Sequence, residues 1–241
     1  MSESNNGGGN NLKKIGLMGG LGPASTVNYY LELVKLCRNA FGEEVYPCIV
    51  IDSVDMGVHT KCFNQQDFKT IGEYIYESLI SLKNAGADFA AITANTEHIA
   101  WDYVKDRLPL PTISIVDATI QEIKNKDYRK VVTFATEWTL NSGLYEKAIS
   151  EAGSTAIVPN KEDQIILGNL IYPNLENGIV IPEDKEKMIQ LAEKYIKEYD
   201  ADALLLGCTE IPIMIQQEDI SVPVINTTQI HIDAIFEMAK K

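Results

Sequence analysis

Cys208 is the residue of this 241-residue chain whose type and position most clearly indicate chemistry. It follows Gly207 at the end of an apolar segment, residues 203–206, that is typical of a buried strand. A thiol at a helix N-terminus has a lowered pKa, so the nucleophilic thiolate is more populated. The alternative is a small buried hydrophobic residue, which is the commoner role of a free cysteine. Cys37, on a predicted helix, fits that alternative.

Four polar motifs, including that of Cys208, each follow a predicted strand at its carboxyl end. Each turn leads into a helix N-terminus, where backbone N–H groups and small hydroxyl groups favour an anion. The chemistry that they share is carboxylate or phosphate binding with few charged side chains. The motifs are Gly19–Pro23 (GGLGP), Thr93–His98 (TANTEH), Thr136–Thr139 (TEWT) and Gly207–Glu210 (GCTE).

The glycine-rich turn is not a dinucleotide-binding fingerprint. The sequence Gly20-x-Gly22-x-x-Ser25 lacks the third glycine, and Pro23 interrupts it. No acidic residue follows at a strand end about 20 residues later, and no Gly-Lys-Ser/Thr of a Walker loop is present. We therefore expect a tight turn whose backbone faces an anion.

The composition excludes several classes of function. A net charge of −13 argues against a nucleic-acid partner, because phosphate binding needs a positive surface. No polybasic patch for a membrane surface is present, and no apolar run approaches the roughly 20 residues of a membrane helix. The four cysteines form no CxxC pair and the three histidines have no metal-ligand spacing, so we expect no metal. Residues 1–11 lack the pattern of a signal peptide and are predicted to be a flexible tail, which favours a cytoplasmic location with free thiols.

Short apolar segments alternate with amphipathic helical patterns along the rest of the chain. Nearly continuous apolar runs suit strands buried on both faces of a parallel sheet. The predicted fold is therefore α/β, with two pseudo-symmetric Rossmann-like lobes, 12–118 and 119–241, whose parallel sheets carry helices on both faces. The predicted strands are 15–18, 48–54, 89–93 and 112–116 in the first lobe and 131–135, 155–158, 203–206 and 222–225 in the second. The predicted helices are 24–38, 66–85, one from about 140, and 184–199.

The two lobes also match each other in sequence. FAAITANTE (89–97) can be aligned with ADALLLGCTE (201–210), which makes Glu210 the counterpart of Glu97. Ligands of such folds bind beyond the carboxyl ends of the strands. Two pseudo-symmetric lobes therefore predict an active site in the cleft between them.

Three motifs, KKIGLMGGLGPAST, ITANTEH and LLLGCTEIP, together resemble those of the aspartate/glutamate racemase family, and the similarity runs from about Lys14 to Ile235. The resemblance implies a cofactor-independent homodimeric enzyme in which an amino acid lies between two cysteines. One thiolate removes the α-proton, and the other thiol delivers a proton to the opposite face. Because no pyridoxal group takes up the electrons, preorganised donors must stabilise the carbanion.

The resemblance also assigns site residues. It makes Cys208 the second catalytic thiol and places Ala94 at the position of the first. Asn95, Thr96 and Thr209 are expected to hold the α-carboxylate. Two further polar contacts are Thr136 and Thr139, and the remaining predicted substrate-binding residues are Met18, Gly19, Lys61, Glu97, His98 and Glu210.

Ala94 departs from the family, which usually has Cys and in some members Thr at this position. Alanine cannot transfer a proton, and Thr93 should point away from the site by the two-residue alternation of a strand. Three interpretations stay open. The alanine is an engineered substitution that traps a ligand; or Cys208 works alone, as in a decarboxylase or isomerase of a small diacid; or another acid, Glu97 or His98, replaces the thiol. A non-catalytic carboxylate-binding protein is the alternative from another class.

A second departure concerns the side-chain carboxylate of an acidic substrate. Family members that take aspartate often use an Arg after the second strand and a Lys in the second lobe. Here residues 53–67 contain no Arg, their only basic residues are His59 and Lys61, and Asn177 stands near the expected Lys. Lys61 is either a solvated loop residue or a replacement cation. If neither basic residue enters the cleft, a neutral amino acid or another carboxylate fits better than aspartate.

Overall fold

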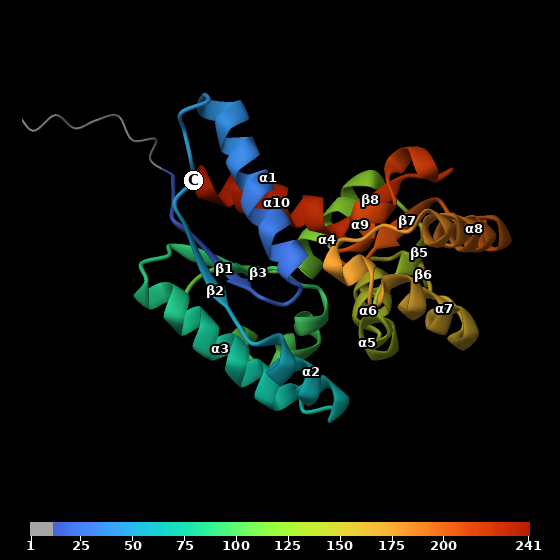
Figure 1. Cartoon of the computed structure of the whole chain (residues 1–241), viewed down its shortest axis with the longest axis horizontal. Helices are drawn as coiled ribbons and strands as arrows, with labels where there is room; N and C mark the ends of the chain where they lie inside the picture. The colour runs from blue at the N-terminus through green and yellow to red at the C-terminus, as the bar shows by residue number, and fades with distance from the viewer. Residues whose placement is uncertain (1–11) are drawn as a thin grey trace, which may run out of the picture.

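Two four-stranded parallel sheets organise the molecule, each in its own lobe and each flanked by helices (Figure 1). A computed structural model describes residues 12–241, and the predicted tail, 1–11, lies outside the described residues. The predicted α/β class with two parallel-sheet lobes is confirmed. The first sheet has the order β2-β1-β3-β4, with β1 (Ile15–Gly19), β2 (Ile49–Ser53), β3 (Phe89–Ile92) and β4 (Thr112–Ile113). The second has the order β6-β5-β7-β8, with β5 (Lys130–Phe134), β6 (Thr155–Ile157), β7 (Ala203–Leu206) and β8 (Val224–Asn226).

Helices connect the strands, as parallel pairing requires. The α-helices are α1 (Pro23–Phe41), α2 (Met56–Asn64), α3 (Phe68–Asn84), α4 (Ile115–Lys126), α5 (Glu137–Ser142), α6 (Leu144–Glu151), α7 (Lys161–Ile171), α8 (Pro182–Tyr199), α9 (Ile211–Met214) and α10 (Thr227–Ala239). Four 3-10 helices complete the set, η1 (Thr96–Tyr103), η2 (Lys105–Arg107), η3 (Leu175–Asn177) and η4 (Gln217–Asp219).

Three predicted elements need correction. The predicted strand 112–116 ends at Ile113, because the Ser114 side chain accepts the N–H of Asp117 and so begins α4. The stretch 53–67, expected to be a loop, contains α2, which Asp55 caps. The predicted strand 222–225 begins two residues later, at Val224.

The register of the central strands relates the two lobes. Ile92 of β3 pairs with Met18 of β1, and Leu206 of β7 pairs with Phe134 of β5. Ala94 and Cys208 each lie two residues beyond such a pair and are therefore equivalent. The alignment that made Glu210 the counterpart of Glu97 is wrong by one residue, because it matched the shared Thr-Glu dipeptide instead of the strand ends.

Two helices each pack against the lobe opposite to the one whose last strand they follow. The helix α10 follows β8 of the second sheet but packs on the first, where Ile232 and Ile235 join Ile15 and Leu17 in one buried cluster. The helix α4 follows β4 of the first sheet, and its Ile123 packs with residues of the second sheet. The two helices also contact each other, and α10 lies beside α1 (Figure 1). The predicted division between residues 118 and 119 falls inside α4.

His231 links α10 to the first lobe through two hydrogen bonds. Its Nδ1 lies 2.9 Å from the hydroxyl of Tyr29 on α1, and its Nε2 lies 3.0 Å from the carbonyl oxygen of Ile113 on β4. Since the carbonyl can only accept, Nε2 carries the proton and Nδ1 accepts from the tyrosine. The imidazole is fully buried and neutral, because burial lowers its pKa to about 3. His231 is therefore a structural contact between helices.

Replacing His231 by Gln should change how stability depends on pH. The unfolded chain binds a proton on His231 below about pH 6.5, whereas the folded state excludes it until about pH 3. The wild type therefore loses free energy of unfolding at this site as the pH falls, and the variant does not. We expect the stability difference between them to shrink by up to about 1.4 kcal/mol per pH unit between pH 6 and 4, measured by urea unfolding. Curves that stay parallel over this range would contradict a neutral, buried His231.

Candidate active site

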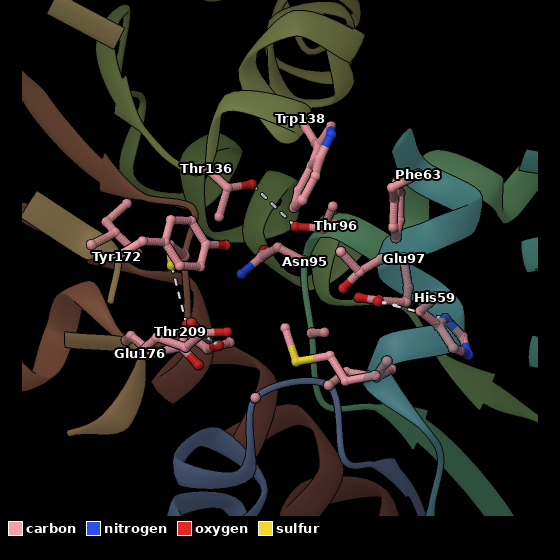
Figure 2. Close-up of a pocket in the computed structure, with 18 residues that line it drawn as sticks. His59, Phe63, Asn95, Thr96, Glu97, Thr136, Trp138, Tyr172, Glu176 and Thr209 are labelled. Atoms are coloured by element: carbon pink, nitrogen blue, oxygen red, sulfur yellow. Dashed lines mark hydrogen bonds and ion pairs between the residues drawn. The ribbon is translucent and has the colours of Figure 1, made fainter. Parts of the chain in front are cut away.

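Polar side chains from both lobes line a pocket at the carboxyl ends of both sheets (Figure 2). The turns after β1, β3, β5 and β7 all contribute, as the predicted position at the strand ends requires. The helices α2 and α5 and the segment from α7 to η3 complete the wall. The 18 lining residues are Leu21, Gly22, Met56, His59, Thr60, Phe63, Ala94, Asn95, Thr96, Glu97, Thr136, Trp138, Ile171, Tyr172, Glu176, Cys208, Thr209 and Glu210.

Eight of the thirteen predicted catalytic and substrate-binding residues line this pocket: Ala94, Asn95, Thr96, Glu97, Thr136, Cys208, Thr209 and Glu210. Five others do not. Met18 is fully buried in the first core, and a Cβ at Gly19 would meet the side chain of Thr26 instead of the pocket. Lys61 lies on the exposed side of α2. His98 and Thr139 lie outside the lining and hydrogen-bond to lining residues, His98 to Ala94 and Thr139 to Thr96.

His98 contacts the site through its backbone. The Nδ1–H donates to the carbonyl oxygen of Ala94 over 3.1 Å, and the ring packs against Trp101 with centroids 5.3 Å apart. Burial lowers the pKa of His98 to about 4, so the imidazole is neutral. His98 therefore positions the turn that carries Ala94.

The helix α2 contributes lining residues that the sequence reading treated as a loop. Met56, His59, Thr60 and Phe63 lie at positions i, i+3, i+4 and i+7, the spacing of one helical face. That spacing is the feature of the sequence from which a helix over these residues could be predicted. Phe63 stacks on Trp138 of α5, with ring centroids 5.6 Å apart, so this face also joins the two lobes.

Three threonine hydroxyls form a second inter-lobe contact at the pocket. Thr96 of η1 lies 3.2 Å from Thr136 and 3.0 Å from Thr139, and the latter two are 3.0 Å apart. Thr136 is also the N-cap of α5. The cluster presents uncharged hydroxyl groups from both lobes, and Figure 2 shows Thr96 and Thr136 turned toward each other.

Asn95 is held in place by residues of the second lobe. The Tyr145 hydroxyl donates to its Oδ1, and its Nδ2 donates to Thr227 Oγ1 over 3.3 Å. The side chain is 3% exposed. One N–H of the amide is left to face the pocket, which Asn95 lines.

Cys208 shares a hydrogen bond with a carboxylate. Its Sγ–H donates to Glu210 Oε2 over 3.1 Å, and the Thr209 hydroxyl donates to the same oxygen over 2.9 Å. Burial raises the pKa of the Cys208 thiol, and the charge of Glu210 raises it further. The expectation of a lowered thiol pKa is therefore wrong, because burial outweighs the effect of α9, a helix of four residues.

Gly22 brings the glycine-rich turn against this pair. Its φ of +97° suits glycine, and a Cβ there would lie 2.5 Å from Glu210 Oε1. The space beside this glycine is therefore taken by a carboxylate of the protein itself.

The other charged groups of the pocket are also carboxyl groups. Burial raises the pKa of Glu97 to about 8, with a further contribution from Glu210, and burial raises the pKa of Glu176 as well. His59, whose Nδ1 lies 3.8 Å from Glu97 Oε1, has a pKa lowered by burial. Within residues 12–241, no Lys or Arg lines the pocket. The site is thus rich in proton donors and acceptors and poor in positive charge.

Two further properties bear on the chemistry of the described chain. No cluster of three or more His, Cys, Asp or Glu side chains in residues 12–241 could hold a metal ion. None of the helices in this part of the chain combines the length and apolar character needed to cross a membrane.

Comparison with known proteins agrees with this geometry. The sequence profile of the Asp/Glu/Hydantoin racemase family matches residues 18–235. The broad specificity amino-acid racemase RacX of Bacillus subtilis (strain 168) is 24% identical over 217 residues, which cover 89% of this chain and 92% of RacX. The crystal structure of a putative Asp/Glu racemase from Yersinia pestis superposes with a TM-score of 0.86 at 28% identity, over 95% of this chain and 100% of that one. An aspartate racemase homologue from Pyrococcus horikoshii OT3 gives a TM-score of 0.83 at 33% identity, with the same coverage. The chain therefore belongs to the Asp/Glu/Hydantoin racemase family.

Proposed function

We propose that this protein is an amino-acid racemase in which Cys208 moves a proton at the α-carbon of a substrate bound between the lobes. The observation that supports it best is the Cys208–Glu210 hydrogen bond at the pocket wall, in a chain of a racemase family. It places a thiol and a proton acceptor together where the carboxyl ends of both sheets meet.

The proton transfer begins on this pair. When Glu210 accepts the thiol proton, Cys208 becomes a thiolate in a buried site. The thiolate then takes the α-proton: the carbon–hydrogen bond breaks, a sulfur–hydrogen bond forms, and the electron pair delocalises into the substrate carboxylate. Thr96 and Thr136 offer uncharged hydroxyl donors for the charge that develops there.

The charge of the pocket favours a substrate whose side chain is neutral or positive. In the pocket lining, no Lys or Arg from residues 12–241 could balance a second carboxylate, and each of Glu97, Glu176 and Glu210 would repel it whenever it is ionised. Lys61 is exposed and does not line the pocket; His59 does line it, but its lowered pKa keeps the imidazole neutral. The broad specificity in the name of the relative RacX is consistent with such a choice. The same argument disfavours the decarboxylation or isomerisation of a diacid.

The activity can be tested by proton NMR in D₂O with both enantiomers of alanine, lysine and aspartate, followed by chiral analysis. We expect loss of the α-proton signal with inversion for alanine or lysine, and at least about 100-fold slower exchange for aspartate. Cys208→Ser should reduce exchange by about 100-fold or more, with an unchanged circular dichroism spectrum. Ligand-induced thermal stabilisation without any exchange would instead indicate a binding protein, and product from a diacid would indicate a single-thiol enzyme.

Glu210→Gln should make Cys208 easier to ionise. The charge of Glu210 raises the thiol pKa, so its removal should shift the pH midpoint of Cys208 alkylation by iodoacetamide to lower pH. The modified peptide is quantified by mass spectrometry, with the exposed Cys48 as an internal reference. A midpoint that does not move would show that Glu210 does not act on the thiol.

The homodimer implied by the resemblance and the cytoplasmic location stay predictions; sedimentation equilibrium of the purified protein tests the first.

A further inference from the structure

Racemisation needs a second acid–base group, and the residue equivalent to Cys208 cannot supply it. The equivalent is Ala94, whose methyl group carries no transferable proton. Thr93 does not replace it, because its hydroxyl donates to the carbonyl oxygen of Met18, away from the pocket. His98 does not either, since it lies behind the Ala94 backbone. The first-lobe side of the pocket must hold another group.

We propose that Glu97 is the second acid–base group, acting on the face of the α-carbon opposite Cys208, and that His59 carries protons between Glu97 and solvent. The proposal rests on the proposed function, because it presupposes that Cys208 acts on the α-carbon.

Glu97 occupies the right part of the pocket. It lies three residues after Ala94, in the first turn of η1, and both residues line the pocket. The small methyl group of Ala94 leaves the Glu97 carboxyl group within the pocket lining. Figure 2 shows Glu97 on one side of Asn95 and Thr209, the neighbour of Cys208, on the other.

Both reacting groups face the same space. Burial raises the pKa of the Tyr172 hydroxyl, and the charges of Cys208 and Glu97 each raise it further. Tyr172 lines the same pocket as Cys208 of the second lobe and Glu97 of the first. A pKa of about 8 leaves Glu97 with both protonation states accessible near neutral pH.

His59 connects this carboxyl group to a second cavity. The side chain is 3% exposed, its Nδ1 has no hydrogen-bond partner, and that atom lies 3.8 Å from Glu97 Oε1. His59 also lines an open cavity with Asp52, Asp55 and Glu77, whose other wall includes Ser78. The Ser78 hydroxyl is likewise buried without a partner. Unpartnered buried polar atoms are costly, and His59 lines both cavities, so its unpartnered Nδ1 points to a proton path.

The reaction balances without a further reactant. In one direction the Cys208 thiolate takes the α-proton, and Glu97 donates its carboxylic proton to the opposite face, leaving a thiol and a carboxylate. The enzyme returns to its starting state when Glu210 releases to solvent the proton that it first took, the thiol gives its own proton to Glu210, and Glu97 regains one through His59. The opposite enantiomer uses the same groups in reverse order.

Glu97→Gln tests the catalytic role. Racemisation should fall by about 100-fold or more, while one enantiomer, the one whose α-proton faces Cys208, still exchanges deuterium with retained handedness. Exchange of the other enantiomer should be lost. Inversion at the wild-type rate would overturn the proposal, whereas a wild type that exchanges neither enantiomer would contradict the proposed function instead.

Two variants serve as controls. Glu137→Gln makes the same change on the exposed side of α5, outside the pocket, and should leave both enantiomers active. In the double variant Glu97→Gln, Ala94→Cys, the thiol restored at position 94 should recover inversion. This recovery would show that the single variant folds and lacks only an acid.

The role of His59 in carrying protons between Glu97 and solvent is tested with His59→Ala. Its racemisation rate should fall, and imidazole in the buffer should restore it through the second cavity. Cyclopentanol, which has a similar size but no titratable nitrogen, should not. A rate equal to that of the wild type, or equal rescue by both compounds, would overturn the role of His59 in proton transfer.

Discussion

The exchange of α4 and α10 between lobes is the contact on which the rest of the structure depends. Each helix leaves the sheet that it follows in the chain and packs against the other. Neither sheet can therefore turn away without exposing buried apolar side chains of both lobes, at about 25 cal/mol per Å² of apolar surface. The carboxyl ends of the two sheets are held face to face as a result. The smaller contacts at the pocket, such as the threonine cluster, add to the packing that already sets the relative position of the lobes.

Burial sets the chemistry of the pocket more than nearby charges do. It is the first cause of the raised pKa of Cys208, Glu210 and Glu97, and of the lowered pKa of His59. Each of these groups is pushed toward its neutral form. A site that holds its protons in this way can both give and receive one near neutral pH.

The sequence predicts the fold and the place of the site well, for a physical reason. Strands buried on both faces must be apolar, so β3 and β7 stand out, and Cys208 is found at the end of β7. The pocket-lining face of α2 is harder to predict from the sequence, because only nine residues form the helix and most of them are polar or small.

The protonation states are not accessible from sequence. The thiol pKa of Cys208 depends on how deeply the residue is buried and on its contact with Glu210, and neither follows from its position before a helix. Strand pairing likewise supports the equivalence of Ala94 and Cys208 that the family resemblance implies, whereas the match of the two Thr-Glu dipeptides was displaced by one residue.

The close approach of Gly22 to Glu210 distinguishes this glycine-rich turn from the phosphate-binding turns of nucleotide-binding folds. In nucleotide-binding folds such a turn leaves room for a phosphate of the ligand. Here the room is taken by a carboxylate that the chain supplies almost two hundred residues later. An anion could reach this space beside Gly22 only by displacing the carboxylate that accepts the hydrogen bond of Cys208.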